Sequence, residues 1–261
     1  MGGCVQIEAK QGKDEMMRKN LRTALQRGAT EMGADFFGIA DILPFRETFS
    51  RTWPLSLEKF FCGISIGMTL NHWIVDRLSP SSGVLEAKLY WHHCYAVVNQ
   101  QLDWIVLRMA AMIQREGFRA VPVPVTVKVD EQELLGPFTH KAVGRLAGLG
   151  WIGKSCLLVT PQVGPRVRWA TVLTDAPFRP TGKPLGQGCD SCECCVKACP
   201  VNAFTGREFR QDEPIELRYD VKKCQAYLKS ALVCGLCLAS CPRGRATEKP
   251  DKVSGCDVSV P

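Results

Sequence analysis

The chain has 261 residues, of which 46% are hydrophobic and 23% charged, the composition of a globular protein with room for a substantial core. No run of about 18 apolar residues could cross a membrane as a helix, and the polar N-terminal segment lacks the apolar stretch of a secretory signal. We therefore expect a cytoplasmic protein without a membrane anchor. The formal net charge of +7 would suit nucleic-acid binding, but the basic residues are not gathered into one segment, so the sequence does not support that function.

The hydrophobic pattern of the N-terminal part predicts alternating helices and strands. Helical spacing of apolar residues predicts helices at residues 14–33, 85–116 and 139–147. Short apolar runs predict strands at residues 36–40, 62–70, 121–129, 156–160 and 167–174. The prolines in 121–129 suit an edge strand. This alternation indicates an α/β or α+β core.

The cysteines divide the chain into two regions. Ten of the fourteen fall between Cys189 and Cys256, after a linker-like stretch of proline and glycine at residues 180–188. Because the cytoplasm keeps thiols reduced, so dense a group indicates metal ligands and not a disulfide scaffold. We predict two domains, residues 1–185 and residues 186–261.

The first cysteine run is Cys189-x2-Cys192-x2-Cys195-x3-Cys199-Pro200. This is the spacing of bacterial ferredoxins that hold two [4Fe–4S] clusters, in which the fourth cysteine of the run binds the other cluster. Two-residue spacers let a tight loop place three thiolates around one cubane. The run therefore predicts an iron–sulfur site.

The second run, Cys234-x2-Cys237-x3-Cys241-Pro242, repeats the pattern without its leading cysteine, and Cys224 is the natural eighth ligand. We assign one cluster, called the first set below, to Cys189, Cys192, Cys195 and Cys241. The other cluster, the second set, is assigned to Cys199, Cys224, Cys234 and Cys237. The alternative is a pair of structural zinc sites, although zinc ligand pairs are usually separated by a longer spacer.

A glycine-rich turn, Gly148-Leu-Gly-Trp-Ile-Gly153, matches the GxGxxG pattern of dinucleotide-binding proteins. That motif follows a strand, opens a helix and has an acidic residue about 20 positions later. Here the predicted helix comes first, the strand follows, and position 173 is leucine. The turn therefore does not predict dinucleotide binding.

The combination of Lys141-Ala142, the segment from Ala147 to Lys154, Leu173-Thr-Asp-Ala-Pro177 and the two cysteine runs resembles epoxyqueuosine reductases and the related reductive dehalogenases. The resemblance covers residues 30–245. It implies a nitroreductase-like domain that binds cobalamin, followed by a two-cluster ferredoxin-like domain that delivers electrons to the cobalt. FMN is the alternative cofactor, because the related nitroreductase fold binds it.

The same resemblance implies which residues hold the cofactor. Glycines suit close backbone approach because they have no Cβ. The implied cofactor-binding residues are Lys141, Gly148, Leu149, Gly150, Trp151, Ile152, Gly153 and Lys154.

Two departures from the family concern the substrate. Epoxyqueuosine reductases continue into a C-terminal helical-repeat region that helps hold tRNA, and this chain is expected to lack it. Their catalytic aspartate lies three residues before a proline, which corresponds here to Leu134 if Pro137 is that proline; Asp130, Glu131 and Glu133 are near but out of register. We therefore expect a short relative with a different substrate, a small molecule, and keep tRNA as the less favoured alternative.

Reduction consumes protons, and the segment from Tyr90 to Tyr95 is the densest group of titratable residues in the first domain. The candidate proton donors are His92, His93, Tyr95 and His140. The alternative is that these side chains pack or face water, or that His140 and Lys141 hold the phosphate or amides of the cofactor. Arg166 and Arg168, which flank the next strand, could reach a carboxylate or phosphate, or could lie exposed.

Three functions remain open from the sequence. The first is a cobalamin-dependent reductase, fed by an external low-potential donor such as a ferredoxin or flavodoxin. The second is a non-catalytic protein that delivers electrons to the cofactor of a partner. The third is a flavin-dependent reductase of the same architecture.

Overall fold

The computed structural model describes residues 2–48, 56–129, 136–231 and 234–244. The predictions about Leu134 and the acidic residues before it lie outside these ranges. None of the helices described is both long and apolar enough to cross a membrane.

The described chain contains helices and strands in alternation. The α-helices are α1 (Gly2–Glu31), α3 (His72–Asp76), α4 (Val84–Trp91), α5 (Val98–Arg115), α6 (His140–Leu146), α7 (Cys194–Lys197), α8 (Val221–Ser230) and α9 (Leu236–Ala239). The strands are β1 (Phe36–Asp41), β2 (Cys62–Thr69), β3 (Ala120–Val123), β4 (Trp151–Ile152), β5 (Leu158–Val159) and β6 (Val167–Thr174). A π-helical turn, η2 (His92–Val97), joins α4 to α5, and three 3-10 turns are η1 (Leu43–Phe45), η3 (Ile215–Leu217) and η4 (Pro242–Gly244).

Four strands form an antiparallel sheet in the order β1-β2-β6-β3, and β4 pairs with β5 in a separate two-stranded sheet. Every pairing is antiparallel, so the described core is of the α+β kind. The predicted strands at the positions of β1, β2 and β6 are confirmed. The predicted edge strand is also at an edge, as β3, but it is shorter than expected.

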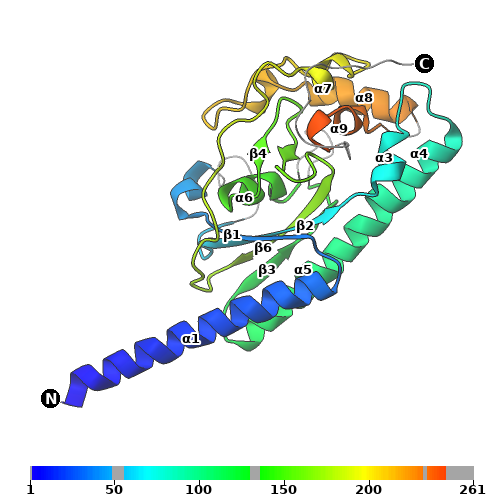
Figure 1. The fold of residues 1–261 in the computed structure, drawn as a ribbon. Coiled ribbons are helices and arrows are strands. Elements are labelled where there is room, and N and C mark those ends of the chain that lie inside the picture. The colour runs from blue at the N-terminus through cyan, green and yellow to red at the C-terminus, as the bar shows by residue number, and fades with distance from the viewer. Residues whose placement is uncertain (1, 49–55, 130–135, 232–233, 245–261) are drawn as a thin grey trace.

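Helices cover both faces of the four-stranded sheet, with α1 and α5 on one side and α6 on the other (Figure 1). Ile64 and Ile66 of β2 pack into the core beneath α1 and α5. The alternate residues of β2 face α6 and are small: a Cβ on Gly63 would lie 2.8 Å from Val143 Cγ1. Because these positions lack bulk, α6 can approach the sheet closely and place His140 beside Thr171 of β6.

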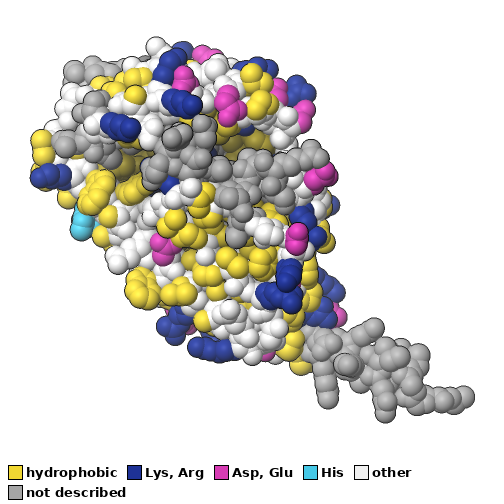
Figure 2. Space-filling model, turned by 180° about the vertical axis from the view of Figure 1, so that it is seen from behind, with side chains coloured by type: hydrophobic (Ala, Val, Ile, Leu, Met, Phe, Trp, Pro, Cys, Tyr) yellow, Lys and Arg dark blue, Asp and Glu magenta, His cyan; other side chains and the backbone are white. Residues whose placement is uncertain are grey.

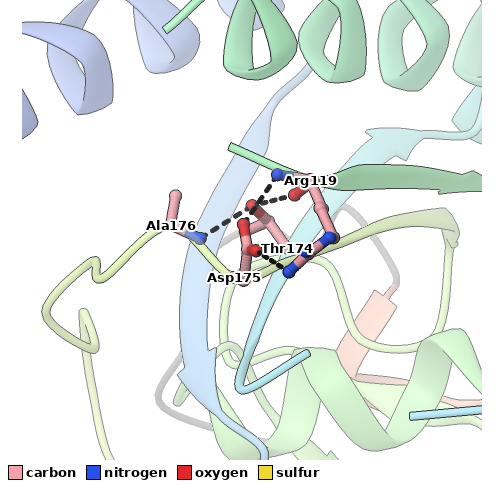
Figure 3. Close-up of polar contacts among 4 residues, drawn as sticks. All are labelled: Arg119, Thr174, Asp175 and Ala176. Carbon is pink, nitrogen blue, oxygen red and sulfur yellow. Dashed lines mark hydrogen bonds and ion pairs between the residues drawn. The ribbon is translucent and has the colours of Figure 1, made fainter. Parts of the chain in front are cut away.

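Polar contacts fix the end of β6 to the residue before β3 (Figure 3). Arg119 donates from its backbone and its guanidinium to the Asp175 carboxylate, at 2.7 and 3.1 Å. The Thr174 hydroxyl donates to the Arg119 carbonyl at 2.7 Å and accepts from the backbone N–H of Ala176 at 3.0 Å. This cluster holds the chain where it leaves the sheet for the linker.

The cysteine-rich segment covers one end of the sheet domain (Figure 1). Leu238 and Ala239 of α9 share a hydrophobic cluster with Ile74 of α3 and Tyr90 of α4. The two regions predicted from the cysteine distribution are therefore in direct apolar contact. On the face drawn in Figure 2, basic and acidic side chains are interspersed with apolar ones.

Candidate redox site

Short helices and loops bring the first set of cysteines together. Cys195 lies in α7, and Cys241, which is 46 residues later in the chain, follows α9. The pKa of Cys195 is raised to about 12, mainly by burial and then by the charges of Cys241, Cys189 and Cys192. These are the three other cysteines assigned to the same cluster, so their sulfurs lie within electrostatic reach of one another.

The second set assembles in the same way. Burial raises the pKa of Cys237 most, and the charges of Cys234, Cys195, Cys224 and Cys199 raise it further. Three of these four partners complete the second set. The fourth, Cys195, belongs to the first set, which indicates that the two sets adjoin.

Thiolates are the ligands that iron–sulfur clusters require, and each of the four thiolates of a cubane binds a different iron. Among the described residues, no group of three or more His, Cys, Asp or Glu side chains is placed to hold a metal ion. Partly buried thiolates that repel one another also need compensating metal charge. The donor set therefore fits two [4Fe–4S] clusters, and their presence remains a proposal.

The glycine-rich turn packs against the loop of the first set. A Cβ on Gly153 would lie 3.3 Å from Cys189 Sγ, and the Lys154 ammonium donates to the Asp190 carbonyl at 2.8 Å. A Cβ on Gly150 would overlap the carbonyl oxygen of Val159. Contacts within the chain thus account for these glycines, and the cofactor-binding role of residues 148–154 stays a proposal.

A cavity of about 170 Å³ lies where β6, α6, the start of α5 and α9 meet. Its lining combines polar and apolar side chains from both cysteine-rich and sheet regions. The lining residues are Tyr95, Asn99, Val125, Thr126, His140, Lys141, Leu157, Leu158, Pro165, Val167, Arg168, Trp169 and Leu238. The structure therefore brings together four residues that the sequence singled out, Tyr95, His140, Lys141 and Arg168.

His140 opens α6 and is held neutral. Its Nδ1 lies 3.0 Å from the Thr171 hydroxyl. Its pKa is lowered to about 4, chiefly by burial; the backbone of Pro124 opposes this shift and the charge of Lys141 adds to it. A neutral imidazole at pH 7 is a poor proton donor, so His140 is better suited to orienting a ligand than to the predicted role of acid.

Lys141 is half-buried in the cavity lining and contacts the loop that follows the glycine-rich turn. Its ammonium donates to the carbonyl of Cys156 at 2.7 Å. Burial lowers its pKa, and the charges of Cys156 and Cys237 oppose that shift. The guanidinium of Arg218 lies 3.9 Å from Cys156 Sγ. Cys156 itself has a left-handed backbone, with a φ of 55°.

Arg168 forms the opposite wall of the cavity. Its Nε donates to the Cys94 carbonyl at 3.0 Å, and its guanidinium carbon lies 4.5 Å from the ring centre of Tyr95. Two buried atoms of the lining residues, Asn99 Oδ1 and Trp169 Nε1, have no hydrogen-bond partner. Buried polar atoms are seldom left in this state, so a bound ligand with both a donor and an acceptor would complete the site.

The structure places the other two predicted donors elsewhere. His92 and His93 are exposed on η2, with their rings 4.7 Å apart, and neither belongs to the cavity lining. Asn99, Trp169 and Arg218 were not predicted. Arg218 lies 62 residues from Cys156 in the chain, and no local pattern links the two.

The cavity formed by the described residues is too small to enclose a corrin ring. Pockets for drug-sized ligands measure roughly 300–1,000 Å³, and a corrin is larger than most such ligands. The cavity of about 170 Å³ suits a small ligand or a part of a larger one.

Comparison with known proteins shows that the chain is similar to two groups of reductases. No protein-family model matches the chain. The epoxyqueuosine reductase of Listeria monocytogenes is 35% identical over 118 residues, which are 42% of this chain and 31% of that protein. The tetrachloroethene reductive dehalogenase of Sulfurospirillum multivorans is 35% identical over 109 residues, covering 37% of this chain and 22% of the dehalogenase.

Solved structures give the same two groups. A reductive dehalogenase described with B12-dependent dehalogenation has a TM-score of 0.64 and 21% identity, covering 85% of this chain and 31% of that one. An epoxyqueuosine reductase bound to a tRNA-Tyr stem loop has a TM-score of 0.58 and 17% identity, covering 87% of this chain and 66% of that one. The chain is thus a relative of both groups and has their fold, and it spans less than a third of the length of the two curated relatives named above.

Proposed function

We propose that this protein is an iron–sulfur oxidoreductase that passes electrons through two [4Fe–4S] clusters to an acceptor bound in the cavity. One observation carries the proposal: Leu238, which directly follows Cys237 of the second set, lines the cavity. An acceptor there lies one residue from a cluster ligand. The relatives that share the motifs are reductases, which agrees with electron transfer from the clusters to a bound acceptor.

The parts of the site have separate roles in this proposal. The clusters supply one-electron transfer, at potentials set by burial and by hydrogen bonds to sulfur. The apolar walls exclude water from the acceptor. Neutral His140, together with Arg168 and Asn99, orients the ligand, and Tyr95 and Lys141 are the lining groups placed to supply a proton.

The acceptor to test first is cobalamin, because a solved relative is described as B12-dependent. FMN is the alternative that the nitroreductase-like resemblance implies. The division into a cofactor domain at residues 1–185 and a cluster domain at residues 186–261 belongs to the same proposal. The proposal also includes a small-molecule substrate and an external low-potential electron donor.

The experiment is an anaerobic titration of cluster-loaded protein with Co(II) cobalamin, followed by EPR. A saturable change to a base-off Co(II) signal would identify cobalamin as the acceptor. Loss of that change in Lys141→Met, with iron content unchanged, would place it at the cavity. No change with both clusters present would exclude cobalamin, and FMN would then be titrated in the same way by absorbance.

The small cavity favours one second candidate, an electron-delivery protein whose acceptor belongs to a partner. That function predicts cluster reduction without turnover by the protein alone. Turnover would appear only when the partner is added.

A further inference from the structure

The first set of cysteines depends on a ligand from a distant part of the chain. Three of its members, Cys189, Cys192 and Cys195, share a short loop, whereas Cys241 lies 46 residues beyond Cys195. The ferredoxin spacing places the three thiolates of the loop, but it does not place the fourth. Contacts elsewhere in the structure must therefore hold Cys241 beside them.

Arg166 is placed to supply those contacts. It directly precedes β6, and its carbonyl accepts from the backbone N–H of Leu70 at 2.8 Å, so its backbone is tied to the end of the sheet. Its side chain is completely buried. The sequence left open whether this arginine reaches a carboxylate or lies exposed, and the structure shows that it reaches one.

The guanidinium of Arg166 links α3 to α9. Its Nη2 forms an ion pair with the Asp76 carboxylate at 2.5 Å and also donates to the carbonyl of Ala239 at 3.4 Å. Its Nη1 lies 3.3 Å from His72 Nδ1. A buried guanidinium whose fork of donors reaches several groups is held in one orientation. Ala239, the last residue of α9, comes two residues before Cys241.

Arg166 also contacts the chain that follows Cys241. A Cβ on Gly244, the last residue of η4, would lie 2.8 Å from both Cδ and Nε of Arg166. The N–H of Gly244 donates to the Cys241 carbonyl at 3.2 Å. The arginine side chain therefore touches the chain on both sides of Cys241 and ties that segment to the sheet.

We propose that Arg166 is the positioning residue that holds Cys241 as the fourth ligand of the first set. This inference rests on the proposed function, because it assumes a [4Fe–4S] cluster at these cysteines. The role differs from that of Lys154, whose ammonium contacts the loop of the other three ligands. Without Arg166, the three loop thiolates would keep their irons, and the iron bound to Cys241 would be lost first.

The test is the conversion of the first cluster to a [3Fe–4S] cluster when cluster-loaded protein is treated anaerobically with ferricyanide. Ferricyanide accepts the one electron released when Fe(II) leaves an oxidised [4Fe–4S] cluster, and the [3Fe–4S] product gives an EPR signal that the intact oxidised cluster lacks. Arg166→Gln should convert about tenfold faster than the wild type, because supporting contacts typically change metal affinity by about 10–100-fold. It should release about one iron per chain.

Three further variants define the cause of that change. Asp76→Asn removes the ion pair from a carboxylate that is 45% exposed, so the fold should tolerate it, and its rate should lie between those of the wild type and Arg166→Gln. Arg166→Lys keeps the charge but lacks the planar fork that reaches Asp76 and Ala239 together, and should restore the rate only in part. Asp175→Asn is the matched control, because it breaks an arginine–carboxylate pair at the opposite end of β6 and should leave the rate unchanged.

A double variant shows whether Arg166 acts through Cys241. Cys241→Ala removes the ligand itself and should give the full [3Fe–4S] signal. Adding Arg166→Gln should change neither that signal nor the iron content, because effects that pass through one shared partner are not additive. A further loss of iron in the double variant would show that Arg166 supports other ligands and would refute the inference.

The outcomes separate this inference from the proposed function. A wild-type protein without two cubanes would refute the proposed function itself. Two intact cubanes, with wild-type rates in both Arg166→Gln and Asp76→Asn, would refute the inference alone. Full restoration by Arg166→Lys, a faster rate in Asp175→Asn or loss of a whole cluster from Arg166→Gln would refute it as well. If Arg166→Gln does not fold, Asp76→Asn decides by the same measurement.

Discussion

The pKa of His140 links the site to the stability of the whole protein. In an unfolded chain a histidine has a pKa of about 6.5. In the folded protein burial lowers that value to about 4. As the pH falls below about 6.5, the unfolded state therefore binds the proton first, and the stability that neutral His140 contributes is progressively lost.

A comparison of the wild type with His140→Gln at two pH values tests this assignment. Between pH 7.5 and 5.5 the wild type should lose about 1 kcal/mol more of its unfolding free energy than the variant does. Urea unfolding of the cluster-loaded protein under anaerobic conditions measures both values. Equal losses would mean that His140 is not held neutral by its surroundings.

Two glycines illustrate how local surroundings decide the effect of the same substitution. Gly150→Ala would place a Cβ against the backbone carbonyl of Val159, which cannot move without breaking the β4–β5 pair. We expect a loss of roughly 1–3 kcal/mol. Gly28→Ala lies inside α1 with nothing within 4 Å, and should instead stabilise the protein by about 0.5–1 kcal/mol. Thermal unfolding of both variants checks the opposite signs.

At the scale of elements, the long apolar strands were predictable and the short ones were not. β2 and β6 are buried along most of their length, so their continuous apolar runs mark them in the sequence. The predicted strand at 121–129 ends early as β3, because Val125 turns to donate its N–H to Asp103 of α5 at 3.0 Å. The predicted strand at 156–160 shrinks to β5, because Cys156 has a left-handed backbone.

The contact between β6 and the start of β3 gives a prediction at this scale. Thr174→Val keeps the shape of the side chain but leaves the buried N–H of Ala176 without an acceptor, at a cost of about 1–3 kcal/mol. Thr174→Ser retains the hydroxyl and should cost less. Urea unfolding ranks the two variants, and an equal or reversed ranking would show that the hydroxyl does not anchor this end of the sheet.

At the scale of the molecule, the spacing of the cysteines predicts two sets of cluster ligands, but no pattern in the sequence predicts what lies beside them. Three ligands of the first set follow the ferredoxin spacing, whereas Cys241 comes from the second run. Arg166 pairs with Asp76 across 90 residues and Arg218 reaches Cys156 across 62. Such pairs depend on how α3, β5 and the cysteine-rich segment pack, and no periodicity in the sequence records that packing.

The contact between the glycine-rich turn and the first set of cysteines predicts how firmly iron is held there. Lys154→Gln removes the ammonium that holds the Asp190 carbonyl between Cys189 and Cys192. Supporting contacts of this kind typically change metal affinity by about 10–100-fold, so iron should be lost about tenfold faster to a chelator. Lys183→Gln, an exposed lysine of the linker, should leave the rate unchanged.

The proposed function requires that eight cysteines hold two [4Fe–4S] clusters, and iron and acid-labile sulfide analysis of anaerobically reconstituted protein measures this. We expect about eight irons and eight sulfides per chain. Changing the first-set ligands Cys192 and Cys241 together to serine should lower both to about four. Stoichiometric zinc without sulfide, or iron that does not change in the double variant, would contradict the claim.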